Sequence, residues 1–137
     1  MQVTQIPFIQ HIGINKSTEY NVELENKEIV QNHIGSIHAS AQFTLAETQS
    51  GLFLQNLFPE LVGKVVPLLR ASSVKYKHPA TTMIMANASI EESVKEKFLV
   101  QFSRKGRATI IVSVEVRDVD DTLTMEGEFT WFVQKIG

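Results

Sequence analysis

Residues 32–47, with the sequence NHIGSIHASAQFTLAE, open the segment that decides the fold. From Ser36 to about Asn56 the chain has no proline and only one interior glycine, Gly51, and it is rich in Ala, Leu, Gln and Glu. These residue types favour a helix, and the stretch is long enough for about five or six turns. We therefore expect one long helix over residues 36–56.

The faces of this helix differ in chemistry when its residues are placed at the helical period. The mainly apolar stripe comprises Ile37, Ala41, Leu45, Thr48 and Leu52. The polar stripe comprises His38, Gln42, Gln49 and Asn56. The remaining face comprises Ser36, Ser40, Phe43, Glu47, Ser50, Gly51 and Leu54.

Glu47 is the only charged residue of this third face. The small side chains around it would let another subunit or a ligand approach the backbone, and Phe43 and Leu54 would desolvate the carboxylate. Desolvation would raise the pKa of Glu47 toward values suited to a general base. The structural alternative is a buried Glu that hydrogen-bonds to backbone or to a partner helix.

Alternation of apolar and polar residues predicts strands on both sides of the helix. The expected strands are residues 17–25, 68–77, 81–90, 107–118 and 122–134. The last two form a long hairpin across the acidic turn that starts at Asp118. The Ser89-x-x-Glu92 spacing predicts a capping box, which would start a short helix ending at Lys105 and Gly106.

These elements indicate an α+β fold in which a helix packs on an antiparallel sheet. The chain of 137 residues is 43% hydrophobic and contains no internal repeat or linker, so we expect a single domain over residues 1–137. The absence of Cys excludes disulfides, thiolate zinc sites and Cys nucleophiles. His11, His33 and His78 lack paired ligand spacing, so no metal site is expected.

The net charge of −2 argues against general nucleic-acid binding. No apolar run approaches the roughly 20 residues that span a bilayer, and the N-terminus lacks the features of a signal peptide. We therefore expect a cytoplasmic protein without a membrane or nucleic-acid partner.

The spacing of Asn32, Gly35, His38 and Glu47 resembles that of the hotdog-fold thioesterases. The similarity is to the phenylacetyl-CoA and 4-hydroxybenzoyl-CoA thioesterase branch, in which Asn, Gly and His-Gly-Gly precede a helical Asp or Glu. Residues 76–80 (YKHPA) and 127–132 (GEFTWF) are similar to two strands of that family. The resemblance implies a five-stranded antiparallel sheet wrapped around a long central helix, with a short helix before the last two strands.

The resemblance also implies hydrolysis of a small or medium acyl thioester of coenzyme A or of acyl carrier protein. The backbone N–H of Ala39 would polarise the carbonyl, and Glu47 would activate water or attack directly. Asn32 and His38 would orient the thioester or the water, although regular helical spacing places His38 opposite Glu47 unless His38 is the N-cap. The family further implies a homodimer or a dimer of dimers with the acyl pocket at the subunit interface, and no cofactor besides the coenzyme A of the substrate.

Further residues are candidates for substrate binding. Gly35, Ser40 and Phe43 surround the start of the helix, and Ser72 and Ser73 follow the position where some family members carry a helper Ser or Thr. The cationic candidates for the phosphates of coenzyme A are Lys75, Arg104 and Lys105, although Arg104 and Lys105 would equally suit a solvated helix end.

Two departures from the family pattern affect the expected site. His38-Ala39-Ser40 replaces His-Gly-Gly, so the backbone at this point is less open to close approach. Glu47 replaces the commoner Asp and extends the carboxylate by one methylene.

Other catalytic patterns are absent from the sequence, which lacks a Gly-x-Ser-x-Gly elbow, a Gly-rich phosphate loop with Lys and a paired-His metal motif. The remaining alternatives are an acyl-binding module that has lost turnover, an enoyl-thioester hydratase of the same fold, and a purely structural domain with an unreactive Glu47.

Overall fold

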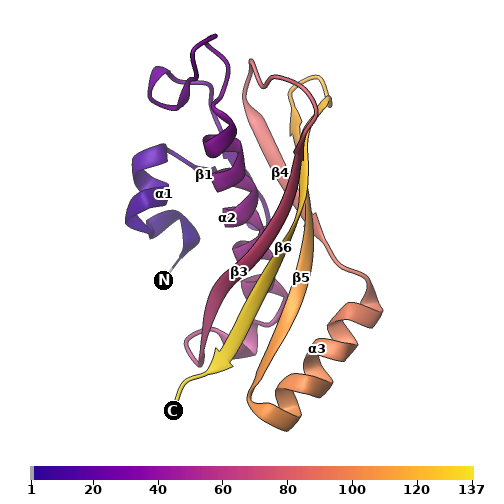
Figure 1. Cartoon of the computed structure of the whole chain (residues 1–137). Helices are drawn as coiled ribbons and strands as arrows, with labels where there is room; N and C mark the ends of the chain where they lie inside the picture. The colour runs from indigo at the N-terminus through magenta and orange to yellow at the C-terminus, as the bar shows by residue number, and fades with distance from the viewer. Residues whose placement is uncertain (1) are drawn as a thin grey trace.

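The computed structural model describes residues 2–137, which form a six-stranded antiparallel sheet with a long helix on one face (Figure 1). The helices are η1 (Val3–Gln5), α1 (Pro7–Ile12), η2 (Glu28–Val30), α2 (Ala39–Leu57), η3 (Pro59–Leu61) and α3 (Glu92–Lys105). The strands are β1 (Asn15–Lys16), β2 (Val22–Leu24), β3 (Val65–Tyr76), β4 (Ile84–Ser89), β5 (Arg107–Asp118) and β6 (Leu123–Lys135).

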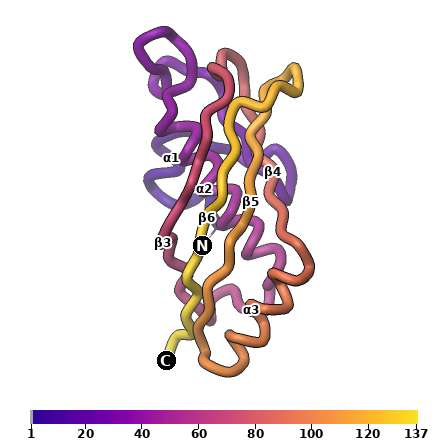
Figure 2. The backbone as a smooth tube through the Cα atoms, turned by 45° about the vertical axis from the view of Figure 1, so that its right-hand side comes forward, coloured from indigo at the N-terminus to yellow at the C-terminus, as the bar shows by residue number. Residues whose placement is uncertain are grey.

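The sheet order is β1-β2-β4-β5-β6-β3, so the long strand β3 lies at one edge. Figure 2 shows β3, β6 and β5 running side by side with α2 behind them, while Figure 1 shows α1 on the far side of α2. The expected arrangement of a long helix packed on an antiparallel sheet is confirmed. The expected number of five strands is wrong, because the short β1 adds a sixth strand by pairing with β2.

Several element boundaries differ from those expected. The helix expected over residues 36–56 is α2, which begins at Ala39 because His38 is its N-cap, and the strand expected over residues 68–77 begins at Val65. The predicted strand over residues 17–25 is reduced to β2, because the N–H groups of Ser17 and Thr18 turn back to the Asn21 carbonyl. The strand expected over residues 81–90 begins only at Ile84. The predicted capping box is also wrong, because the N-cap of α3 is Glu91 and its side chain makes no capping hydrogen bond.

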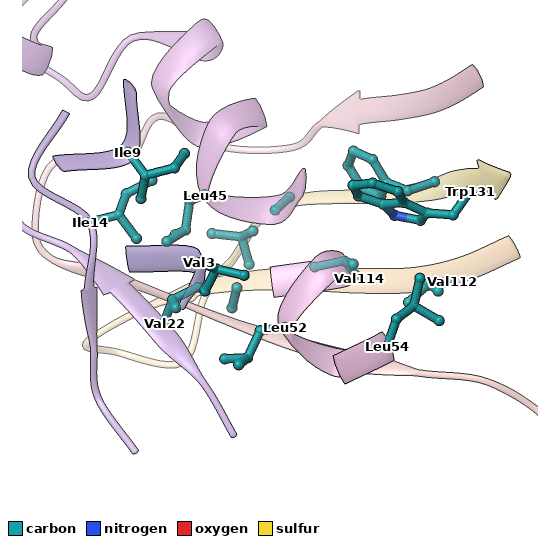
Figure 3. Close-up of a cluster of buried hydrophobic side chains, with 14 of the residues drawn as sticks. Val3, Ile9, Ile14, Val22, Leu45, Leu52, Leu54, Val112, Val114 and Trp131 are labelled. Atoms are coloured by element: carbon teal, nitrogen blue, oxygen red, sulfur yellow. The ribbon is translucent and has the colours of Figure 1, made fainter. Parts of the chain in front are cut away.

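The N-terminal helix α1 was not predicted from the sequence. Pro7 occupies its first turn, and Gly13 ends it at a φ of 89°, a conformation that glycine adopts without strain. Val3 and Ile9 of the N-terminal segment are buried. Figure 3 shows Ile9 and Ile14 gathered with Leu45 of α2, so this segment covers the helix face that the sheet leaves free.

All members of the predicted apolar stripe are buried, and all of them except Ile37, which precedes the helix, lie on α2. Two Gln residues of the predicted polar stripe are also buried, and they differ in their bonding. The Gln49 amide accepts a hydrogen bond from Val22 N–H at 2.9 Å and donates one to the Tyr20 carbonyl at 2.8 Å. Gln49 thereby joins α2 to β2, whereas the Oε1 atom of Gln42 has no hydrogen-bond partner.

Candidate active site

The first turn of α2 leaves one backbone donor available. His38 is the N-cap, and its Nδ1 atom accepts a hydrogen bond from the Ser40 N–H at 2.9 Å. The His38 carbonyl accepts the N–H groups of Ala41 and Gln42. Among the described residues no acceptor faces the N–H of Ala39, so this group can bind an external anion or carbonyl at the positive end of the helix dipole.

The loop before α2 is organised by Asn32. The Oδ1 atom of Asn32 accepts the N–H groups of Ile34 and Ser36, and its Nδ2 atom donates to the Ser36 hydroxyl at 2.8 Å. Gly35 in this loop has a φ of 77°, which a side chain would strain. Asn32 therefore positions the entry to α2. Its side chain, which the resemblance assigns to orienting the thioester or the water, makes three hydrogen bonds within the loop.

A hollow of about 280 Å³ adjoins the start of α2. Asn32, Ala39, Gln42 and Tyr76 are among the residues that line it. The Tyr76 hydroxyl donates to the Ala39 carbonyl at 3.2 Å, and partial burial raises the pKa of Tyr76 above its ordinary value of 10.0. Tyr76 thus remains a neutral donor that ties the end of β3 to the first turn of α2.

Glu47 lies in the middle of α2 on a half-buried stripe. Its neighbours at the helical spacing of four, Phe43, Gly51 and Gln55, are half-buried as well. Desolvation by burial raises the pKa of the Glu47 carboxyl above the ordinary value of 4.5. Within residues 2–137 no cation or hydrogen-bond donor pairs with this carboxylate, so the structure shows no backbone partner that would make it a purely structural buried Glu.

The distance along the helix separates the two candidate catalytic groups. Ala39 and Glu47 are eight residues apart in one helix, which corresponds to about 12 Å along its axis. Both groups must approach one thioester carbonyl within about 3 Å if they act on the same substrate. Two groups so far apart on one helix are too distant to meet at one carbonyl unless a second helix contributes.

The three candidates on β3 point to different sides of the sheet. Ser72 is opposite Phe129, whose ring lies 5.5 Å from that of Phe43, so Ser72 shares the α2 side. Ser73 and Lys75 alternate with it and line a polar hollow on the outer face together with Glu126. The structure therefore brings Ser72 toward the helix and places Ser73 and Lys75 on the opposite face from Glu47.

Arg104 and Lys105 end α3, far along the molecule from the start of α2. Phe98 of α3 stacks on Phe58, which follows the last residue of α2, at a ring distance of 4.8 Å. Arg104 and Lys105 line a hollow of about 520 Å³ along the exposed face of α3. Because α2 is 19 residues long, or about 28 Å, these cations do not join Ala39 within one copy of the chain.

The sequence analysis did not indicate the contacts of three residues of this region, Tyr76, Gln42 and Trp131. Tyr76 contacts Ala39, and Gln42 lies beside residues 77–79. Both arrangements join segments that are distant in the sequence, so no local sequence pattern indicates them. Trp131 is buried, and it also lines a cavity beside α2. The alternation of residues 123–133 could place Trp131 on the helix side, but it could not indicate a cavity there.

Two further observations concern ligands and membranes. Residues 2–137 contain no group of three or more His, Cys, Asp or Glu side chains that could hold a metal ion. In the same part of the chain, every helix is too short or too polar to cross a membrane.

The fold is the hotdog fold, as comparison with solved structures shows. A Pseudomonas aeruginosa protein described as a probable thioesterase is 19% identical, covers 98% of this chain and 91% of its own, and has a TM-score of 0.83. A Haemophilus influenzae thioesterase is 14% identical over 98% of this chain and 87% of its own, with a TM-score of 0.75. A Bacillus halodurans protein whose crystal structure contains CoA is 21% identical over 89% of this chain and 72% of its own, with a TM-score of 0.70.

The chain belongs to the family of the domain of unknown function DUF4442, whose pattern matches residues 3–133. No curated protein is significantly similar to it. The structural neighbours are thioesterase-like hotdog proteins, and the phenylacetyl-CoA and 4-hydroxybenzoyl-CoA branch expected from the sequence is not confirmed.

Proposed function

We propose that this protein is an acyl-CoA thioesterase in which Glu47 is the general base and the Ala39 N–H binds the oxyanion. The observation that carries the proposal is the half-buried Glu47 carboxylate, which has a raised pKa and no partner within residues 2–137. A carboxylate kept in such a place costs stability, and a higher pKa makes it a better base. The structural neighbours named as thioesterases, and the one that contains CoA, support the same chemistry.

The reaction follows from the chemistry of these groups. The Glu47 carboxylate takes a proton from a water molecule as the water oxygen bonds to the thioester carbonyl carbon. The Ala39 N–H stabilises the negative charge that develops on the carbonyl oxygen. The tetrahedral intermediate then collapses, the carbon–sulfur bond breaks, and the leaving thiolate takes the proton from the Glu47 carboxyl. The products are a carboxylic acid and free coenzyme A, and Glu47 is again a carboxylate.

The active site in this proposal is formed by two copies of the chain. Glu47 and Ala39 are about 12 Å apart along α2, so each site takes Glu47 from one helix and Ala39 from the antiparallel helix of a second copy. The exposed edge of β3 and the half-buried stripe around Glu47 are the surfaces that such a dimer would cover. This arrangement also gives the expected homodimer a chemical reason.

The first experiment measures free thiol released from short, medium and aromatic acyl-CoA substrates by the wild type and by Glu47→Gln. We expect hydrolysis that falls by roughly 100- to 10,000-fold in the variant, as for loss of a general base. Hydrolysis that is unchanged in Glu47→Gln would contradict the assigned role. Binding of acyl-CoA without hydrolysis would instead indicate an acyl-binding module.

A second variant tests the oxyanion donor without altering a side-chain charge. Ala39 is the first residue of α2, a position that tolerates proline, and His38 has the extended ψ of 141° that precedes proline favourably. Ala39→Pro therefore removes the N–H and leaves the helix intact. We expect an unchanged melting temperature and a loss of roughly 100- to 1,000-fold in kcat.

Co-expression of the two variants distinguishes a shared site from a site within one copy. A mixed dimer of Glu47→Gln and Ala39→Pro contains one site with both defects and one site with neither. An equal mixture should recover about a quarter of the wild-type activity, since half of the dimers are mixed and half of their sites are intact. Activity that stays at the level of the separate variants would place both groups in one copy.

A further inference from the structure

A cavity of about 380 Å³ lies beside the C-terminal half of α2. Its walls come from the N-terminal segment, α2, the loop after α2, and the paired ends of β3 and β6. Apart from glycines and Gln55, the residues that line it are apolar, and among the described residues none of them is charged. Its size falls within the range of small-molecule sites, and its lining suits an apolar group.

One wall of the cavity is held in place by a buried hydrogen-bond chain. The Nε1–H of Trp131 donates to the Ser50 hydroxyl at 2.8 Å, and that hydroxyl donates to the Glu47 carbonyl at 2.6 Å. A Cβ atom built on Gly51 would lie 3.7 Å from the Trp131 ring. The indole is therefore fixed against the backbone of the same helical turns that carry Glu47.

The cavity continues the half-buried stripe on which Glu47 lies. Gly51 is one turn beyond Glu47 on the same face of α2, and Leu54 and Gln55 occupy the next turn. A thioester whose carbonyl is next to Glu47 can thus direct its acyl group along the helix, past Gly51. Figure 3 shows Trp131 and Leu54 on the side of α2 away from Ile9 and Ile14.

The geometry points to this cavity as the binding site for a medium-length alkyl chain of the acyl thioester. The cavity follows α2 from Gly51 to Phe58, which is about 10 Å of helix axis. An extended alkyl chain fills such a length, whereas a single aromatic ring fills only part of it. The choice of an acyl chain over other apolar ligands rests on the proposed thioesterase function.

Trp131 provides a direct measure of occupancy, because it is the only tryptophan in the chain. The binding experiment titrates Glu47→Gln, which does not consume the ligand, with acetyl-, hexanoyl-, octanoyl- and phenylacetyl-CoA and follows tryptophan emission. We expect octanoyl-CoA to shift the emission and free coenzyme A to leave it unchanged. Each added pair of methylenes should tighten binding roughly tenfold until the cavity is full.

Gly51→Leu tests the position of the chain. The added side chain extends toward the Trp131 ring and occupies cavity volume, so binding of octanoyl-CoA in the Glu47→Gln background should weaken at least tenfold. Gln101→Leu adds the same side chain on the exposed face of α3 and should leave octanoyl-CoA binding unchanged. If Gly51→Leu folds poorly, Gly51→Ala replaces it in the test. Its single added methyl group should weaken octanoyl-CoA binding by less.

The outcomes separate the cavity assignment from the proposed activity. Wild-type hydrolysis with no Trp131 response, and with the same chain-length profile in Gly51→Leu, would overturn the cavity assignment and leave the thioesterase function standing. A Trp131 response to octanoyl-CoA without hydrolysis would support the cavity and overturn the thioesterase function. Tighter binding of phenylacetyl-CoA than of octanoyl-CoA would overturn the alkyl assignment. The assignment would also fail if the tryptophan emission changed when the protein alone was diluted but did not respond to any added ligand.

Discussion

Glu47 combines a raised pKa with the cost of keeping a carboxylate half-buried. The folded chain binds the Glu47 proton more tightly than the unfolded chain does, so this group favours folding at low pH. That contribution is lost as the pH rises through the folded-state pKa. We therefore predict that Glu47→Gln raises the melting temperature at pH 7 to 8, and that the gain disappears near pH 4.

The same pKa sets the pH dependence of the reaction. The base acts only when it is ionised, so the acid limb of the kcat/KM profile should lie above pH 4.5, the ordinary value for Glu. Melting curves and rate profiles over a common pH range check both statements. A melting-temperature difference that is constant with pH would show that Glu47 has the same pKa in the folded and the unfolded chain.

Gln42 and Gln49 provide a matched pair for the cost of buried amides. Gln42 is 3% exposed with an unpaired Oε1, so Gln42→Leu should raise the free energy of unfolding by about 1 kcal/mol. Gln49 is 1% exposed and hydrogen-bonds to the backbone of Val22 and Tyr20. Gln49→Leu should therefore lower the free energy of unfolding by about 2 kcal/mol. Urea denaturation measures both, and equal effects of the two substitutions would contradict the assigned bonding.

Local patterns in the sequence indicate candidate residues, whereas the contacts of those residues depend on the folded chain. Glu47 stands out because it is the only charge on its helix face. Ala39 is a candidate only through the family resemblance, because the expected helix begins at Ser36 and the structure begins it at Ala39. The apolar stripe is predicted because helical periodicity is local. Gln42 lines the same hollow as residues 77–79, which are distant from it in the sequence, so no local pattern indicates this neighbourhood.

Elements are predictable where their pattern is long. Strand β5 has the predicted bounds, since its alternation is unbroken over 12 residues. The first expected strand is mostly a turn, because hydrogen bonds to Asn21 compete with the alternating pattern. Helix α1 has only six residues and is stabilised by packing against α2, so it leaves little signal in the sequence.

The pairing of β3 with β6 depends on a glycine. A Cβ atom at Gly127 would lie 2.7 Å from the Val74 side chain and 3.0 Å from the Ser73 carbonyl, so Gly127→Ala must push β3 away from β6. We predict a loss of about 1–3 kcal/mol in the free energy of unfolding. Gly51→Ala, whose new methyl group meets the Trp131 ring at an ordinary distance, should instead gain about 0.5–1 kcal/mol from helix propensity. Thermal denaturation distinguishes the two, and a tolerated Gly127→Ala would mean that β3 shifts freely.

At the scale of the whole molecule, β3 presents an open sheet edge. It is 12 residues long and pairs with β6 on one side, and within the described chain its other side is unpaired. Natural proteins block long exposed edges or use them to pair with another chain. Val66 and Leu68 on this strand are 46% and 56% exposed, and Pro67 between them is the only proline in the strand.

We predict that the protein is a dimer joined through β3, with a mass twice the 15.4 kDa of one chain. Replacing both Val66 and Leu68 by Lys puts cations of two copies close together along the paired edge and should produce monomers, because Lys on an edge strand disfavours pairing. Ile111→Lys is the matched control, since Ile111 is 47% exposed on the central strand β5 and distant from this edge.

Light scattering after size-exclusion chromatography measures the mass, and thiol release measures the activity of the same fractions. If the site takes Glu47 and Ala39 from different copies, the monomeric double variant should lose activity in proportion to its loss of dimer, and the Ile111→Lys control should keep both. A monomer that hydrolyses acyl-CoA at the wild-type rate would show that one copy brings Glu47 and the oxyanion donor together. Because Ala39 and Glu47 are about 12 Å apart along α2, a donor of the same chain other than the Ala39 N–H would then have to bind the oxyanion.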